Sequence, residues 1–127
     1  MSRFLWICLG GAAGTGARYA LSGWILAAIG TGFPYGTLAV NLIGSFLVGA
    51  VVHVALATNS IAPTLRLALT TGFLGGFTTY STFNYETLQY FQEKAWLLGF
   101  ANIAVTVGSC LLAGAAGVVL ARAAVGG

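Results

Sequence analysis

The chain has 127 residues, of which 58% are hydrophobic and only 6% are charged. A soluble domain carries about a quarter charged residues because its surface must stay hydrated, so this composition excludes a soluble enzyme and indicates a protein surrounded by lipid. The five basic residues are scattered along the sequence, which does not suit a nucleic-acid partner. Neither cysteine belongs to a disulfide framework or a metal-binding motif.

The hydropathy pattern predicts an all-α membrane protein with one transmembrane domain over residues 1–127. Crossing a bilayer takes about 20 apolar residues, and four stretches are long enough: about 4–29, 36–57, 64–91 and 95–124. Each is expected to be a helix, since lipid offers the backbone no hydrogen-bond partner. Four spans place both termini on one side of the membrane. Arg3, Arg66 and Arg122 are expected on that side and Lys94 on the other. This positive-inside bias is modest.

Glycine pairs predict close contact between helices. Gly10 and Gly14 lie four residues apart on the first span, and Gly72 and Gly76 repeat the spacing on the third. Small residues at this spacing allow transmembrane helices to approach closely.

The third span contains the stretch GFLGGFTTYSTF, residues 72–83. Glycine lowers helix stability by about 1 kcal/mol per residue, and the hydroxyl side chains compete for backbone hydrogen bonds. Together they predict a helix broken in mid-membrane. Such a break either is packed inside protein or lines a wet cavity, where its freed carbonyls can bind an ion.

Polar side chains on the other spans allow two interpretations. Asn41 on the second span either bonds a neighbouring helix or donates to an anion. On the fourth span, Asn102 and Thr106 form one stripe with Ser109 or Cys110, which either joins two helices or lines an anion path. Tyr80 and Phe83 share one helical face, where their positive ring edges could attract an anion.

Three segments together resemble the Fluc, or CrcB-type, fluoride channels: GGAAGTGARY (10–19), GTLAVNLIGSFLVG (36–49) and GFLGGFTTYSTF (72–83). The resemblance implies passive export of fluoride across the inner membrane by a dual-topology homodimer. Its two four-helix subunits are antiparallel, with two pores along their interface. It also implies a structural sodium ion at the dimer centre, held by the backbone carbonyls of Gly75 and Thr78, and no organic cofactor.

The resemblance also implies roles for single residues. Phe83 matches the second aromatic residue of the pore, while Tyr80 stands where Phe is commoner. Asn41 matches the amide that donates to fluoride, and Arg18 the arginine near the aqueous vestibule. Ser81 and Thr82 match the hydroxyls beside the break, and Glu86 matches the acidic residue after it. Thr106 and Ser109 match a polar track on the fourth span, with Asn102 as a possible extension.

Two other functions fit the same four-span layout. A small proton-coupled multidrug transporter needs a carboxylate inside the membrane, and only Glu86 could supply it, towards the end of the third span. A non-conducting membrane subunit accounts for the glycines but not for the hydroxyl cluster. No residue is expected to perform covalent chemistry, so the chain is not predicted to be an enzyme.

Overall fold

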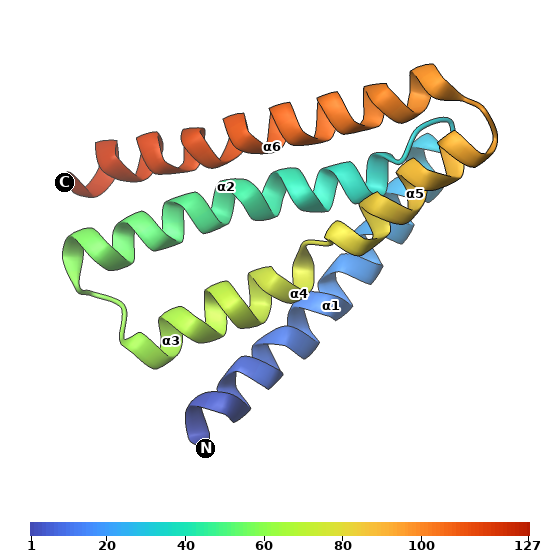
Figure 1. Ribbon diagram of the computed structural model, residues 1–127. Coiled ribbons are helices and arrows are strands. Elements are labelled where there is room, and N and C mark those ends of the chain that lie inside the picture. The colour runs from blue at the N-terminus through green and yellow to red at the C-terminus, as the bar shows by residue number, and fades with distance from the viewer.

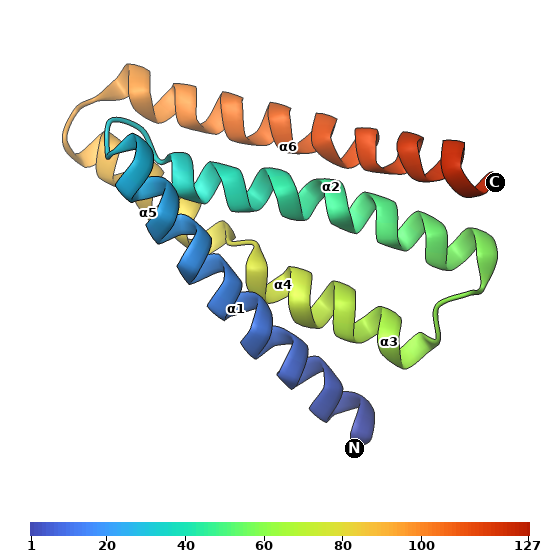
Figure 2. The same ribbon diagram turned by 180° about the vertical axis from the view of Figure 1, so that it is seen from behind.

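The computed structural model describes residues 1–127 and contains helices but no strands. Figures 1 and 2 show long helices joined by short turns, with one segment bent at a break in its middle. In chain order the elements are α1 (Ser2–Ile29), α2 (Tyr35–Thr58), α3 (Pro63–Leu67), the π-helix η1 (Ala68–Leu74), α4 (Gly75–Phe77), α5 (Tyr80–Gln92) and α6 (Trp96–Val125).

Helices α2 and α6 lie side by side over most of their length (Figures 1 and 2). Glycine makes this approach possible, because a Cβ atom on Gly49 would overlap the backbone of Gly114, and one on Gly117 would overlap the backbone of Phe46. These two helices are also long and apolar enough to cross a membrane by themselves. They account for two of the four predicted spans, and the four-span count stays a prediction.

The two glycine pairs predicted from the sequence meet each other. A Cβ atom on Gly72 would lie 2.7 Å from the Ile7 carbonyl oxygen and 3.3 Å from the Gly10 Cα atom, and one on Gly76 would lie 2.6 Å from the Gly11 carbonyl oxygen. Helix α1 therefore packs backbone to backbone against η1 and α4, which confirms the predicted contact.

The third helical segment is interrupted at Thr78 and Thr79, whose backbones are extended, with ψ angles of 160° and 116°. Gly75 and Gly76 remain helical in α4, so the glycines do not themselves unwind the chain as expected. Gly76 serves the contact with α1 instead. The break falls on β-branched residues, which suit extended backbone, and the Thr79 hydroxyl caps α5 by accepting the Thr82 N–H at 3.1 Å.

Helix α5 ends in a Schellman motif. The N–H of Lys94 donates to the Phe91 carbonyl at 3.0 Å, and the N–H of Ala95 donates to the Tyr90 carbonyl at 2.8 Å. Lys94 has a φ angle of 59°, a left-handed conformation that glycine adopts at lower cost. This motif turns the chain from α5 into α6.

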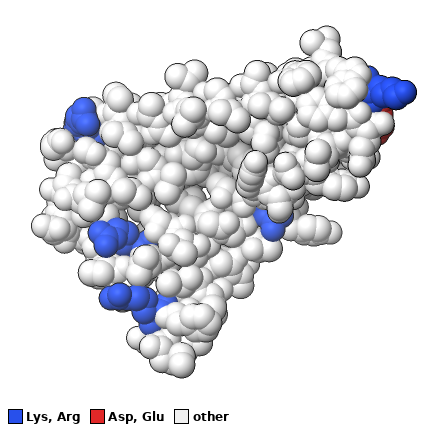
Figure 3. Space-filling model, in the orientation of Figure 1, with Lys and Arg blue, Asp and Glu red and all other residues white.

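Basic groups gather at one end of the molecule. Figure 3 shows several at the end that carries both termini, one in the middle of the view, and one at the opposite end beside the only acidic group seen from this side. Arg3 lies in the first turn of α1, Arg66 in α3 and Arg122 in the last turn of α6. Only 15 of 127 residues are buried, while Trp24, Leu111 and many other large apolar side chains are exposed. An apolar surface of this extent requires lipid.

Candidate functional site

Two cavities lie on either side of the helix break. The first, here called the vestibule cavity, has a volume of about 820 Å³ and includes Arg18, Thr37, Thr79, Thr82 and Glu86 among its lining residues. The second, here called the aromatic cavity, has a volume of about 560 Å³, and its lining residues include Asn41, Gly75, Thr78, Thr79, Tyr80, Phe83, Thr106 and Cys110. The predicted site residues are therefore divided between two spaces.

Asn41 holds the break in place from α2. Its side-chain oxygen accepts the N–H of Thr79 at 2.8 Å, and its side-chain nitrogen donates to the Thr79 carbonyl at 3.0 Å. The amide nitrogen carries two hydrogens, so one remains after this pairing. Both sequence interpretations of Asn41 are therefore compatible with its geometry: it bonds a neighbouring segment, and it keeps a donor on the wall of the aromatic cavity.

The break releases backbone carbonyls from the helical ladder. In a continuous helix the Gly75 carbonyl would accept the N–H of Thr79, which here donates to Asn41. The Thr78 carbonyl would accept the N–H of Thr82, which here donates to the Thr79 hydroxyl. The two carbonyls named from the resemblance as sodium ligands thus both lose their helical donors. A hard cation binds oxygen atoms of this kind.

Arg18 connects α1 to the same break. Its Nε atom donates to the Gly76 carbonyl at 3.0 Å, which satisfies another carbonyl beside the break. Arg18 is also the only basic residue that lines the vestibule cavity. Its remaining guanidinium N–H groups make no hydrogen bond within the chain, and a positive group in this position favours anions.

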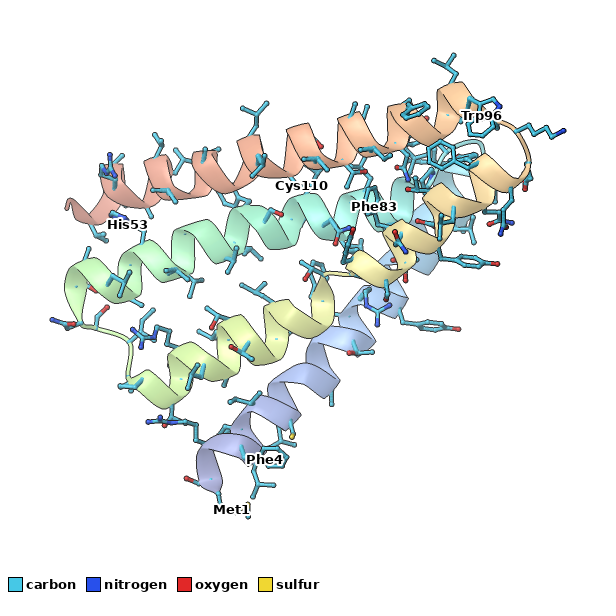
Figure 4. The ribbon with its side chains drawn as sticks, in the orientation of Figure 1. Met1, Phe4, His53, Phe83, Trp96 and Cys110 are labelled. Atoms are coloured by element: carbon cyan, nitrogen blue, oxygen red, sulfur yellow. The ribbon has the colours of Figure 1, made fainter.

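The aromatic pair lies at the start of α5. The ring centroids of Tyr80 and Phe83 are 5.8 Å apart with an interplanar angle of 30°, and both rings line the aromatic cavity. Tyr80 is 69% exposed. In Figure 4, Phe83 lies near the start of α5 close to α2, and Cys110 lies on the side of α6 that faces α2. The cavity is thus open along one side of the single chain.

The polar stripe of α6 serves two purposes. Asn102 is only 1% exposed; it donates to the Thr87 hydroxyl at 2.9 Å and accepts the Thr106 hydroxyl at 3.2 Å. Thr87 in turn donates to the Phe83 carbonyl at 2.8 Å. Asn102 therefore joins α6 to α5, whereas Thr106 also reaches the aromatic cavity.

The two candidates that follow Thr106 on this stripe lie in different places. Cys110 lines the aromatic cavity, but Ser109 lines neither cavity and donates its hydroxyl to the Val105 carbonyl of its own helix. Ser81 is exposed and also lines neither cavity, although its hydroxyl lies 3.4 Å from that of Thr79. Thr82 faces the vestibule cavity with Glu86, of which one carboxylate oxygen is buried without a hydrogen-bond partner.

Thr79, in the hydroxyl run, and Thr37, on the second span, were not among the residues predicted for the site. Thr79 could have been found as the N-cap of a helix that restarts at Tyr80, since threonine is a favoured capping residue. Thr37 is 8% exposed and lines the vestibule cavity. The sequence signal for Thr37 is its position four residues before Asn41, which places both residues on the same face of the helix. The Nε2 atom of His53 lies 3.0 Å from the Gly126 carbonyl oxygen (Figure 4).

An all-helical chain with a largely apolar surface and two cavities beside a broken helix defines a small integral membrane protein. Comparison with known proteins agrees: residues 5–118 match the family described as CrcB-like protein, Camphor Resistance (CrcB), and the chain belongs to this family. It is 58% identical over 127 residues to the fluoride-specific ion channel FluC of Sorangium cellulosum (strain So ce56), with all of both chains covered. It is 49% identical over 123 residues to the FluC protein of Geobacter sp. (strain M21), covering 97% of this chain and 99% of that protein.

Proposed function

We propose that the chain is a fluoride-selective ion channel through which fluoride leaves the cell passively across the inner membrane. The observation that carries the proposal is the full-length similarity to proteins named fluoride-specific ion channel FluC. The structure supports it with two cavities beside a helix break, whose lining residues include amide, hydroxyl and aromatic groups. Groups of this kind can replace the hydration shell of an anion without holding it too tightly to leave. The protein is not an enzyme.

We propose that the working unit is an antiparallel homodimer with two pores. The aromatic cavity is open along one side, and Tyr80 is mostly exposed there. A second copy packed against this side would close the cavity into a pore. The wall of that pore would include Asn41, Phe83 and Thr106. Closed symmetric dimers of this kind are the commonest oligomers.

A structural sodium ion fits the break. The carbonyl oxygens of Gly75 and Thr78 have lost their helical donors, and Gly75 lies at the surface of the chain, where a second copy could add its own pair. Sodium is expected to raise the melting temperature of the purified protein, and potassium at the same concentration to do so less. Equal melting temperatures in the two salts would refute this site.

Fluoride efflux from liposomes tests the function directly. The purified protein is reconstituted into liposomes loaded with fluoride, and a fluoride electrode follows the efflux, with chloride-loaded liposomes as the control. We expect rapid loss of fluoride without loss of chloride, and strongly reduced efflux for Asn41→Asp. The matched control is Asn84→Ala, because Asn84 is exposed and lines neither cavity.

Other outcomes would support the other functions. No fluoride efflux from folded dimers would refute the proposal. Transport of cationic drugs that depends on Glu86 would instead indicate a proton-coupled multidrug transporter. Absence of any ion flux would indicate a non-conducting membrane subunit.

A further inference from the structure

Thr79 is the only residue that lines both cavities. Its neighbours along α5 are divided between them: Thr82 and Glu86 line the vestibule cavity, whereas Tyr80 and Phe83 line the aromatic cavity. Thr79 thus forms a wall shared by the two spaces. An ion that crossed directly from one cavity to the other would pass this residue.

Three hydrogen bonds fix the position of Thr79. Asn41 holds its N–H at 2.8 Å and its carbonyl at 3.0 Å, so both backbone polar groups are engaged by one side chain. The Thr79 hydroxyl oxygen accepts the N–H of Thr82 at 3.1 Å. The backbone can move only by breaking these hydrogen bonds, which costs free energy. The shared wall is therefore rigid.

The hydroxyl of Thr79 keeps its proton available. Its oxygen already accepts the Thr82 N–H, and a hydroxyl group can accept and donate at once. The neighbouring hydroxyl of Ser81 lies 3.4 Å away, near the limit of a hydrogen bond. A neutral donor at this point could replace one water molecule of an anion's hydration shell.

We propose that Thr79 determines permeation: its hydroxyl is the donor that fluoride meets between the vestibule cavity and the aromatic cavity. Asn41 acts here through Thr79, as the positioning residue that fixes the shared wall. This inference rests on the proposed function, since it names the step at which fluoride crosses the break.

The test compares Thr79→Val with Thr79→Ser in the liposome efflux assay. Valine keeps the size and β-branching of threonine but has no hydroxyl, so we expect fluoride efflux per reconstituted dimer to fall about tenfold, the effect of one hydrogen bond on the barrier. Serine keeps the hydroxyl and the helix cap, and we expect it to stay within about threefold of the original protein. Size-exclusion elution and melting temperature verify that each variant is folded.

Thr58→Val is the matched control. The Thr58 hydroxyl also accepts a backbone N–H, that of Ser60 at 3.2 Å, but Thr58 lines neither cavity. We expect this variant to conduct like the original protein. If Thr79→Val conducts as fast as the original protein, the inference is wrong while the proposed function stands. If the original protein itself does not conduct fluoride, the proposed function fails.

A second variant keeps the inference testable if Thr79→Val does not fold. In a background with Cys8→Ser and Cys110→Ser, Thr79→Cys places a thiol on the shared wall. Because Cys110 lines the aromatic cavity, the efflux of this background protein is measured first and serves as the reference. A small methanethiosulfonate reagent is expected to modify this thiol and to stop fluoride efflux, whereas the background protein is unaffected. Mass spectrometry measures the modification. Continued efflux from fully modified protein would overturn the inference.

Discussion

Replacing Asn102 by alanine removes the polar connection between α5 and α6. Asn102 is 1% exposed, and its amide makes hydrogen bonds with the hydroxyls of Thr87 and Thr106. Side-chain hydrogen bonds between membrane helices are worth about 0.6 kcal/mol on average and up to about 1.7 kcal/mol. The bond to Thr87 joins two helices, and the bond to Thr106 lies within α6.

The expected loss of stability combines these contributions. The two hydrogen bonds together account for about 1–3 kcal/mol. The void left by the amide adds to this, because buried groups near it lose their contacts. We therefore expect Asn102→Ala to lower the free energy of unfolding by about 2–4 kcal/mol, with hydrogen bonding as the larger share.

Reversible unfolding in mixed micelles of mild detergent and sodium dodecyl sulfate measures this free energy. Asn84→Ala is the control, since Asn84 is exposed on α5 and makes no side-chain hydrogen bond; we expect a change below about 0.5 kcal/mol. The double-mutant cycle with Thr87→Val isolates the bond between helices, with an expected coupling of about 0.6–1.7 kcal/mol. Equal stability of Asn102→Ala and Asn84→Ala would refute the reasoning.

Three other predictions concern a close contact, a strained turn and the vestibule cavity. Gly14→Ala places a Cβ atom on the backbone of Phe73, so we expect it to lower the free energy of unfolding by more than about 2 kcal/mol. The control is Gly16→Ala, whose Cβ atom would meet nothing within 4 Å and which should be neutral or slightly stabilising. Lys94→Gly relieves a left-handed backbone and should raise the unfolding free energy by about 0.5–1 kcal/mol; an unchanged or lower value would contradict this. Arg18→Met should slow fluoride efflux several-fold at low salt and less at high salt, because salt screens the lost charge; a salt-independent difference would argue against an electrostatic role.

The sequence allowed much of the fold to be predicted. Hydropathy located the helical segments, and the prolines Pro34 and Pro63 mark where two of them begin. Proline starts a helix readily but cannot continue one. The hydroxyl run indicated a break in the third segment. Its position could not be predicted, because it depends on Asn41, which lies 38 residues away in sequence and bonds the backbone of Thr79.

The candidate site was predictable by residue type more than by register. A helical stripe with a period of 3.6 fits Ser109 and Cys110 almost equally well after Thr106. The rotation of α6 against α2 determines which of the two lines the aromatic cavity. This rotation is set by backbone contacts at glycines such as Gly117. For the same reason the division of the site into two cavities could not be predicted from local patterns.

The break also has a consequence for how the chain enters the membrane. The helical piece from Pro63 to Phe77 and the helix α5, which has 13 residues, are each shorter than the roughly 20 residues that a single membrane crossing requires. Helix α5 also carries several polar residues, so its partition into lipid alone is unfavourable. Stable insertion of this segment is therefore expected to depend on its neighbours: the first piece packs against α1, and α5 packs against α6, which follows it in the chain.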